Sequence, residues 1–310
     1  MRNILVVTHT GRNDALAAAA EVCTALIEAG LTPVMTAVEL EDHNRYATEQ
    51  VAPNQSLASV KVLGRDVALE AVELAMVLGG DGTILKAAEI VREAQTPLLG
   101  INLGHVGFLA ESERDGLTDA VRRVVEKDYL VKERLALEVT VISDGKEVFR
   151  TWALNEAAIE KSARERMLEV VLEIDERPLS SFGCDGVVVA APTGSTAYSF
   201  SAGGPVVWPS VEALLVVPIS AHALFARPLV VSPKSMVAVE VMERSSGTGV
   251  LCCDGRRTFD LEPGSRVEVS RSPKPVRIAR FRQGVFTDRL VRKFSLPVVG
   301  WRGHEGGDSN

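Results

Sequence analysis

The sequence has few of the residues that mark disulfide-rich or metal-binding proteins. It contains four cysteines and five histidines in 310 residues, and the histidines show no metal-ligand spacing. Neighbouring Cys252 and Cys253 would point to opposite faces of a strand, which suits neither a disulfide nor a zinc site. We therefore interpret the cysteines as reduced, buried thiols.

Long apolar runs and an excess of positive charge are also missing. No stretch has the length of a transmembrane helix, and the chain opens with Met1-Arg2-Asn3 and a short strand-like run rather than a secretion signal. The 41 acidic residues outnumber the 34 basic ones, for a net charge of −7. Such a charge disfavours general binding to nucleic acids or membranes. We expect a cytoplasmic protein without either partner.

Three common catalytic motifs are absent as well. The sequence contains neither the G-x-x-x-x-G-K-[ST] loop of P-loop enzymes nor the G-x-G-x-x-G fingerprint of hydride-transferring Rossmann enzymes. Gly194-Ser195 lacks the G-x-S-x-G spacing of a nucleophile elbow. A nucleotide enzyme with this sequence would therefore need another phosphate-binding loop.

What the chain does contain is an ordinary globular composition, 46% hydrophobic and 24% charged. Its first 130 residues alternate between apolar strand patterns and helical periodicity. Strands are predicted at 4–7, 32–36, 74–78 and 97–102, and helices at 15–29, 84–92 and 116–127, while 47–65 shows no clear period. This alternation predicts a doubly wound α/β domain with a parallel sheet over residues 1–130.

The pattern changes to strands and turns after about residue 131. Strands are predicted at 135–142, 148–159, 168–174, 186–191, 237–242, 250–253 and 267–270. We expect a mostly β domain over residues 131–285. A helical pattern at 286–294 is expected to pack back on the first domain, and the small, polar segment 303–310 is expected to be disordered.

A glycine-rich turn, residues 79–83, lies between a predicted strand and a predicted helix. Ligands bind at this end of the strands in open α/β sheets, and glycines let the backbone approach a phosphate. Asp81 would repel phosphate, so its suitable task is to take a proton from a hydroxyl or to contact a metal, while Lys86 adds positive charge. A tight turn with Asp81 as an N-cap explains the motif equally well.

Two further segments carry polar groups suited to a nucleotide. Residues 192–205 gather hydroxyls, glycines and Tyr198 after a strand, more small polar residues than a structural turn needs, and follow Cys184-Asp185-Gly186. Asn155-Glu156 could read base edges and ribose hydroxyls, although a solvated strand end is the simpler interpretation. The basic segment 161–166 suits a solvated loop and a phosphate contact equally.

Taken together, these stretches resemble the NAD kinase family over nearly the whole chain. The resemblance rests on GGDGT at 79–83, NE at 155–156 and CDG…PTGSTAYSFSAGGP between 184 and 205. The segments 7–12 and 286–294 resemble the actinobacterial branch. GGDGT is shared with lipid kinases and 6-phosphofructokinases, whereas the run at 192–205 is highly specific.

The resemblance implies a set of site residues. Asp81 matches the family's proton acceptor and, with Gly82, a lining of the NAD site; Lys86 matches a position that faces phosphate. The remaining positions that match NAD-binding or neighbouring site residues are Asn155, Glu156, Arg166, Asp185, Thr196, Ala197, Tyr198, Ser199, Phe200, Ser201 and, at a late position usually filled by a polar residue, Arg256.

The resemblance also implies an α/β domain followed by a β-sandwich, assembled as dimers or tetramers. The implied reaction transfers the terminal phosphoryl group of ATP, and in some bacterial relatives of polyphosphate, to the 2′-hydroxyl of the adenosine ribose of NAD, with Mg²⁺ carried by the donor. A lipid or sugar kinase and a catalytically silent NAD-binding regulator stand as alternatives. The acidic chain lacks a membrane-contacting patch, and the presence of Asp81 argues against the silent regulator.

Overall fold

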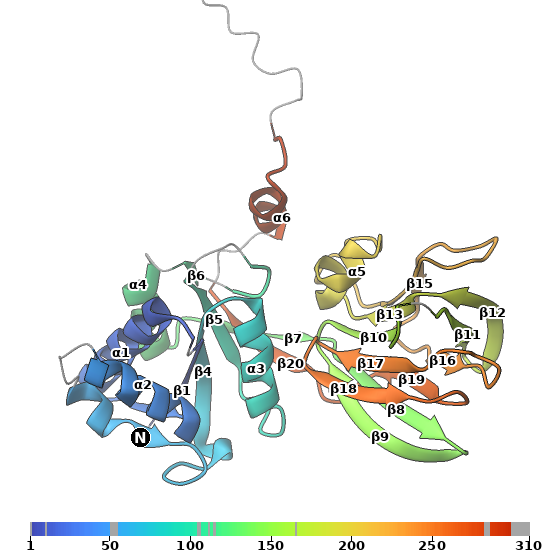
Figure 1. Cartoon of the computed structure of the whole chain (residues 1–310). Coiled ribbons are helices and arrows are strands. Elements are labelled where there is room, and N and C mark those ends of the chain that lie inside the picture. Colours follow the sequence, from blue (N-terminus) through green and yellow to red (C-terminus); the bar gives the residue numbers. More distant parts are fainter. Residues whose placement is uncertain are drawn as a thin grey trace, which may run out of the picture. The chain divides into compact units, whose positions relative to one another are not determined.

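The computed structural model describes residues 2–9, 11–49, 55–103, 107–110, 112–113, 116–164, 166–281 and 286–298. The chain divides into two compact units (Figure 1). The first unit comprises residues 1–132 and 277–310, and the second comprises residues 133–276. Among the described residues, no helix is long and apolar enough to cross a membrane.

The first unit is built on an eight-stranded sheet in the order β3-β2-β1-β4-β5-β20-β7, with β6 beside β5. Strands β3, β2, β1, β4, β5 and β20 pair in parallel. The strands are β1 (Asn3–Thr8), β2 (Thr32–Met35), β3 (Lys61–Val62), β4 (Val72–Leu78), β5 (Leu98–Asn102), β6 (Ser112–Glu113), β7 (Leu130–Arg134) and β20 (Val276–Arg280). The continuous apolar runs of β1, β4 and β5 are buried, as expected for a parallel sheet.

Helices of the first unit follow the strands in a doubly wound arrangement. They are α1 (Asn13–Glu28), α2 (Ala37–Glu49), α3 (Asp81–Val91), α4 (Leu117–Glu126) and α6 (Phe286–Phe294), with short 3-10 turns at Gln55–Ser59 and Leu69–Ala71. The predicted α/β class is therefore confirmed. The sequence analysis did not predict α2, most of which precedes the unassigned segment 47–65. It predicted that the helix after the glycine-rich turn begins at 84, whereas α3 begins at Asp81.

The second unit consists of two six-stranded antiparallel sheets, in the orders β15-β14-β13-β10-β17-β18 and β12-β11-β16-β19-β8-β9. The strands are β8 (Leu137–Ser143), β9 (Lys146–Ala153), β10 (Glu156–Lys161), β11 (Leu168–Ile174), β12 (Arg177–Cys184), β13 (Gly186–Ala190), β14 (Leu214–Ile219), β15 (Leu229–Val231), β16 (Val237–Val241), β17 (Gly249–Cys253), β18 (Arg257–Leu261) and β19 (Arg266–Arg271). A 3-10 turn (Thr193–Thr196) and the short helix α5 (Tyr198–Ser201) follow β13.

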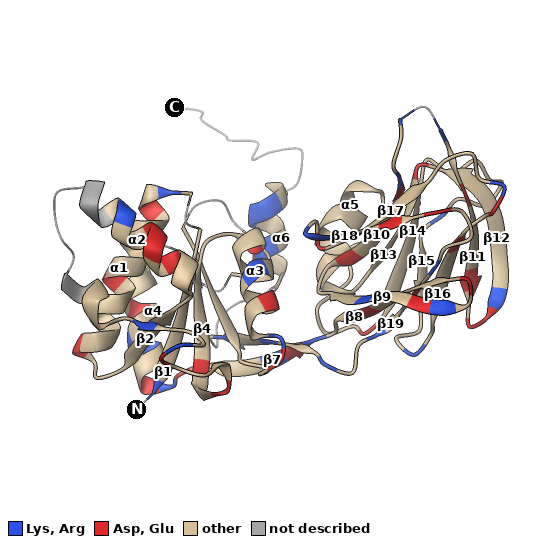
Figure 2. Ribbon diagram, turned by 60° about the horizontal axis from the view of Figure 1, so that its bottom comes forward, with Lys and Arg blue, Asp and Glu red and all other residues tan. Residues whose placement is uncertain are grey.

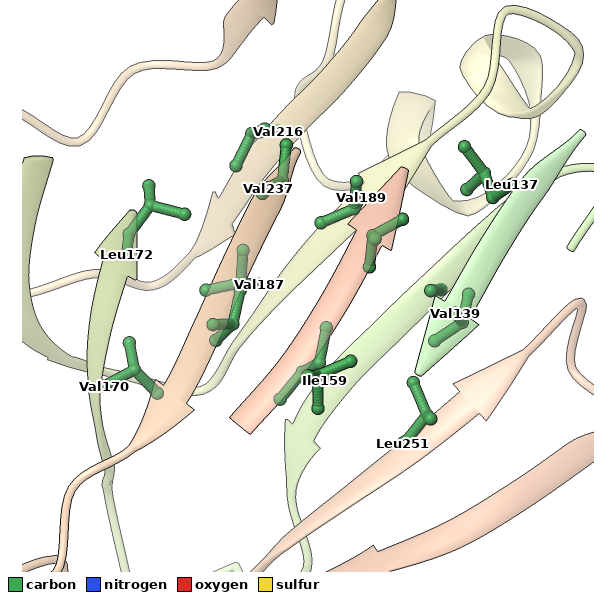
Figure 3. Packing of buried hydrophobic residues seen from close by; sticks show 14 of the residues in the cluster. Leu137, Val139, Ile159, Val170, Leu172, Val187, Val189, Val216, Val237 and Leu251 are labelled. Carbon is green, nitrogen blue, oxygen red and sulfur yellow. The ribbon is translucent and has the colours of Figure 1, made fainter. Parts of the chain in front are cut away.

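The two sheets share one apolar core, which makes the second unit a β-sandwich (Figure 3). Ile159 and Val187 come from one sheet, and Val139 and Val170 from the other, and all four side chains are fully buried. Successive residues of a strand face opposite sides, so Glu156, Ala158 and Glu160 of β10 lie on the outer face of their sheet. Acidic and basic residues are interspersed along the ribbons of both units, with basic residues prominent on α6 (Figure 2).

Two sequence predictions about segmentation were wrong. The run 148–159 is two strands rather than one, because Leu154 and Asn155 interrupt the strand conformation between β9 and β10. The second unit ends at 276 rather than 285, because β20 returns to the first sheet and pairs with β5 through Ile278 and Leu98. The predicted disordered segment 303–310 lies outside the described residues.

Candidate functional site

The first cluster of interest lies at the topological switch point of the parallel sheet. Strands β1 and β4 are neighbours, and the chain continues from β1 to β2 on one side and from β4 to β5 on the other. Open α/β sheets bind ligands where the strand order reverses in this way. Thr8 ends β1 and its hydroxyl donates to Leu78 O at 3.5 Å, while Gly79 and Gly80 continue from β4.

The glycines let α3 start directly at this point. Gly80 occupies the N-cap position and its carbonyl accepts the N–H groups of Thr83 and Ile84 at 3.0 and 3.2 Å. A Cβ atom on Gly79 would lie 2.4 Å from Thr83 Oγ1, so a larger residue there would require the Thr83 side chain to move. The exposed Gly82 follows in the first turn, where helix N–H groups and the helix dipole favour an anion.

Asp81 does not cap its own helix, so the N-cap interpretation is wrong. Its carboxylate instead accepts the N–H groups of Phe108 (to Oδ2) and Leu109 (to Oδ1), both at 3.1 Å. The fit is close, because a Cβ atom on Gly107 would lie 2.5 Å from Asp81 Oδ1. The two amides fix the direction of a carboxylate that stays partly accessible at the start of α3.

Lys86 lies one turn further along α3. Its ammonium forms an ion pair with Glu39 of α2 at 3.0 Å, and the Glu39 side chain is fully buried. Glu39 also accepts the Thr36 hydroxyl at 2.9 Å and the Thr8 N–H at 3.4 Å. The structure therefore places Lys86 beside the switch point with its positive charge held by a buried carboxylate.

The second cluster surrounds Asn155 and Glu156 in the second unit, both of them buried. The carboxylate of Asp254 accepts the N–H groups of Leu154 at 2.9 Å, Asn155 at 2.7 Å and Glu156 at 3.3 Å. Asp254 also pairs with Arg257 at 2.8 Å. One buried carboxylate thus binds the backbone of the segment that joins β9 to β10. Because Asn155 and Glu156 are buried and hydrogen-bonded there, they are not a solvated strand end.

Glu156 is the most strongly perturbed acid of this cluster. Burial, reinforced by the charge of Asp254, raises the pKa of Glu156 to about 8, against a smaller opposing effect of the Tyr198 backbone N–H. No hydrogen-bond partner within the described residues is found for its Oε2 atom, which is buried. A buried carboxyl atom without a partner is a suitable contact for a polar ligand group.

Residues 192–205 divide into structural and accessible groups. Ser195 is buried and bonds Pro192 O at 2.7 Å, and the Thr196 hydroxyl donates to Thr193 O at 3.4 Å. Ser199 is also buried, whereas Tyr198 and Phe200 are 38% and 40% exposed. The Tyr198 hydroxyl bonds Glu160 Oε1 at 2.6 Å, which links α5 to the outer face of β10. Ala197 is half-buried and Ser201 is exposed.

The other predicted residues lie nearby or on loops of the same unit. Asp185, between β12 and β13, pairs with Lys161 at 2.6 Å, and hydrogen bonding from Lys161 lowers the pKa of Asp185. Arg166 is exposed and donates to Ser246 O. Arg256 is exposed in the turn between β17 and β18, and its N–H donates to Cys253 O at 3.0 Å.

Sequence reasoning missed three residues that organise these clusters: Glu39, Phe108 and Asp254. Asp254-Gly255 is a turn dipeptide between two strands, and both residues have positive φ, of 55° and 66°, so turn chemistry could have located this hairpin. Glu39 and Phe108 carry no comparable local signal. Each acts through a contact to a residue 27 or more positions away.

The metal expected from the resemblance can be tested against the side chains. Among the residues that the structure describes, no group of three His, Cys, Asp or Glu side chains could hold a metal ion.

Comparison with known proteins decides the family. Residues 4–129 match the profile of the ATP-NAD kinase N-terminal domain, and residues 154–281 match that of its C-terminal domain. The chain belongs to the NAD kinase family. A protein named NAD kinase from Leifsonia xyli subsp. xyli is 61% identical over 307 residues, 99% of each chain. Another from Thermobifida fusca is 58% identical over 306 residues, 97% of this chain and 92% of that one.

Solved structures share the fold of the NAD kinase family. Yeast NADH kinase complexed with NADH matches with a TM-score of 0.81 at 24% identity, over 98% of this chain and 89% of that one. An NAD kinase from Archaeoglobus fulgidus in complex with ATP matches with a TM-score of 0.70 at 23% identity, over 96% and 100%. The family membership makes this chain a kinase for NAD and favours that activity over the lipid-kinase, sugar-kinase and silent-regulator alternatives.

Proposed function

We propose that the protein transfers the terminal phosphoryl group of ATP to the 2′-hydroxyl of the adenosine ribose of NAD, giving NADP, with Asp81 as general base. The observation that carries the proposal is the Asp81 carboxylate, held by the amides of Phe108 and Leu109 at the switch point of the sheet. A carboxylate in this position can accept the hydroxyl proton as the oxygen attacks phosphorus.

NAD recognition is assigned to the second unit together with Asp81 and Gly82. Asn155 and Glu156 would engage the nucleoside, and the Oε2 atom of Glu156 offers a contact to a ribose hydroxyl. The remaining residues assigned to NAD or its phosphates are Lys86, Arg166, Asp185, Arg256 and the segment Thr196, Ala197, Tyr198, Ser199, Phe200 and Ser201. Exposed Tyr198 and Phe200 offer ring faces to a base.

Phosphate is held in this proposal by backbone N–H groups at the start of α3 and by the charge of Lys86. When bound, Mg²⁺ carried by the donor offsets charge on the phosphate oxygens. Because such contacts do not read adenine, the donor also includes inorganic polyphosphate. We further propose that the enzyme is a cytoplasmic homo-oligomer.

A turnover assay tests the acceptor and the donor together. Purified protein, NAD and Mg²⁺ are supplied with ATP or with ATP-free polyphosphate, and NADP is measured. NADP with both donors is expected. Failure to form NADP with ATP would contradict the proposed reaction, and its absence with polyphosphate alone would restrict the donor to ATP. Diacylglycerol and fructose 6-phosphate serve as control acceptors and should not be phosphorylated.

Asp81→Asn tests the base. We expect kcat to fall ~10²–10⁴-fold, the usual loss for a general base. NAD affinity, measured by calorimetry, should change less, since its contacts are distributed. The matched control is Asp14→Asn, which removes an acid from the first turn of α1, after the neighbouring strand β1.

Loop geometry needs its own control in this experiment. Asparagine has one oxygen, so its amide nitrogen would face one of the two N–H groups that now donate to Asp81. Hydrogen exchange at residues 107–110 reports any resulting opening. An Asp81→Asn protein that keeps more than about a tenth of the wild-type kcat, with an unaltered loop, would defeat the base assignment.

A further inference from the structure

The loop that holds Asp81 is itself held by the C-terminal helix α6. Phe108 is the shared residue: its N–H donates to Asp81, and its carbonyl oxygen accepts a hydrogen bond from Arg289 Nη1 at 2.8 Å. Phe108 and α6 belong to the same unit, although they are separated by 178 to 186 positions in the sequence. The loop therefore connects Asp81, at the start of α3, to α6.

The aromatic side chain of Phe108 reinforces this connection. Its ring centroid lies 5.9 Å from that of Phe286, at the start of α6, and 5.9 Å from that of Phe294, at its end. Both rings are tilted against Phe108, by 41° and 45°, within the range of favourable aromatic pairs. Phe108 is 8% exposed, so the helix and the loop pack together around it.

A single peptide group joins Arg289 to Asp81. The carbonyl of Phe108 and the N–H of Leu109 belong to the same amide, whose oxygen accepts from Arg289 and whose N–H donates to Asp81. A cation at the oxygen end polarises this amide and strengthens its N–H as a donor to the carboxylate at the other end. The arrangement thus aligns a positive side chain, a peptide dipole and a negative side chain in one chain of hydrogen bonds.

We propose that Arg289 is a positioning residue for catalysis, which acts through the Phe108–Leu109 peptide to fix the Asp81 carboxylate. This inference rests on the proposed function of Asp81 as base. A base must lie within hydrogen-bond reach of the proton it accepts, and small displacements of a reacting group are costly. Releasing the peptide would let the carboxylate turn without removing it.

The test compares Arg289→Ala with Arg289→Lys and Arg292→Ala. Arg289→Ala is expected to lower kcat roughly tenfold with little change in KM for NAD, because misplacing the base affects the transition state. Arg289→Lys keeps a cationic donor and should recover most of the rate. Arg292→Ala removes the same charged group from an exposed position of the same helix and should remain near wild type.

Two further measurements separate positioning from a general loss of structure. Arg289→Ala should lower kcat less than about twofold when Asp81 is already Asn, since residues that act as a unit are not additive. Hydrogen exchange at residues 107–110 should accelerate in Arg289→Ala, and it reports on the loop even if Asp81 is not the base. An equal loss of kcat in both backgrounds, or an unchanged kcat with intact NADP formation, would overturn the proposal.

Discussion

At the scale of single residues, environment separates two neighbouring acids of the second unit. Burial raises the pKa of Asp254 as well, but three backbone N–H groups and Arg257 oppose that rise by favouring its charged form. Glu156 is equally buried, yet its Oε2 atom has no such donor among the described residues. The charge of Asp254 adds to the burial that raises the pKa of Glu156 to about 8. A carboxyl with this pKa is mostly protonated at neutral pH.

This pKa predicts how stability depends on pH. The folded protein binds the Glu156 proton more tightly than the unfolded chain, so the associated stability is present below the ordinary value near 4.5 and is lost as pH rises through about 8. Glu156→Gln cannot ionise and should be the more stable protein at pH 8, by on the order of 4 kcal/mol, with a difference of only about 1 kcal/mol at pH 5.

Urea unfolding at pH 5 and at pH 8 measures the effect. Glu169→Gln, in the partly exposed ion pair of Arg244 with Glu169, is the control and should lack this dependence. If wild type and Glu156→Gln lost stability in parallel between the two pH values, Glu156 would not be the titrating group.

At the scale of elements, the hairpin of β17 and β18 stabilises the short connection between β9 and β10. Asp254 lies in the turn of this hairpin, with φ of 55°, and its carboxylate accepts hydrogen bonds from the backbone N–H groups of Leu154, Asn155 and Glu156. The hairpin β8–β9 contains a comparable turn at Asp144-Gly145, with φ values of 50° and 70°, and there the aspartate is exposed. The same turn chemistry therefore serves a buried and an exposed aspartate.

We predict that Asp254→Asn lowers the free energy of unfolding by about 1–3 kcal/mol, because buried N–H groups lose acceptors, and weakens NAD binding roughly tenfold. Asp144→Asn makes the same change in the other turn and should alter neither quantity. Chemical denaturation and calorimetric titration with NAD measure the two effects. If the two variants changed the free energy of unfolding and the NAD affinity equally, the hydrogen bonds of Asp254 would not be the cause of the loss.

The elements also show how far the sequence alone could lead. Buried apolar runs identified β1, β4 and β5, because parallel strands covered on both faces need little else. Helix α2 was missed because polar residues dominate it, and its buried Glu39 bonds Thr8, Thr36 and Lys86 rather than packing in an apolar stripe. Propensity does not report such long-range polar contacts.

The candidate site shows the same division. Motifs supplied Asp81, Asn155 and Glu156, because their residue types and spacing are visible locally. They could not supply Phe108, which bonds Asp81 and Arg289 through backbone atoms that any residue possesses, nor Arg289, whose side chain reaches a residue 181 positions away. The N-cap interpretation of Asp81 was wrong for the same reason.

At the scale of the whole molecule, the open edges of the β-sandwich favour self-association. Val230 of edge strand β15, Leu179 of edge strand β12 and Val148 of edge strand β9 are 57%, 50% and 48% exposed. Leu224 and Phe225, in the segment before β15, are exposed as well. Unpaired edges with apolar side chains are readily covered by another chain.

We therefore predict that the protein sediments at micromolar concentration as a multiple of its 33.3 kDa chain. Sedimentation velocity over a concentration series, combined with activity at each concentration, checks this expectation. A fully active species at the mass of one chain would contradict it.

The insertion of the second unit between residues 132 and 277 has a consequence for synthesis on the ribosome. Residues 133–276 emerge as an uninterrupted block and can fold while the first unit still lacks β20, the partner of β5. Leu98 and Ile278 are 180 positions apart in the sequence. Because closing so long a loop costs entropy, we expect this pairing to form late in folding. Helix α6 follows later still, so a nascent chain would complete the strands proposed to bind NAD well before Arg289 can hold the loop that contacts Asp81. Under the proposed mechanism, catalysis would begin only after α6 has been made.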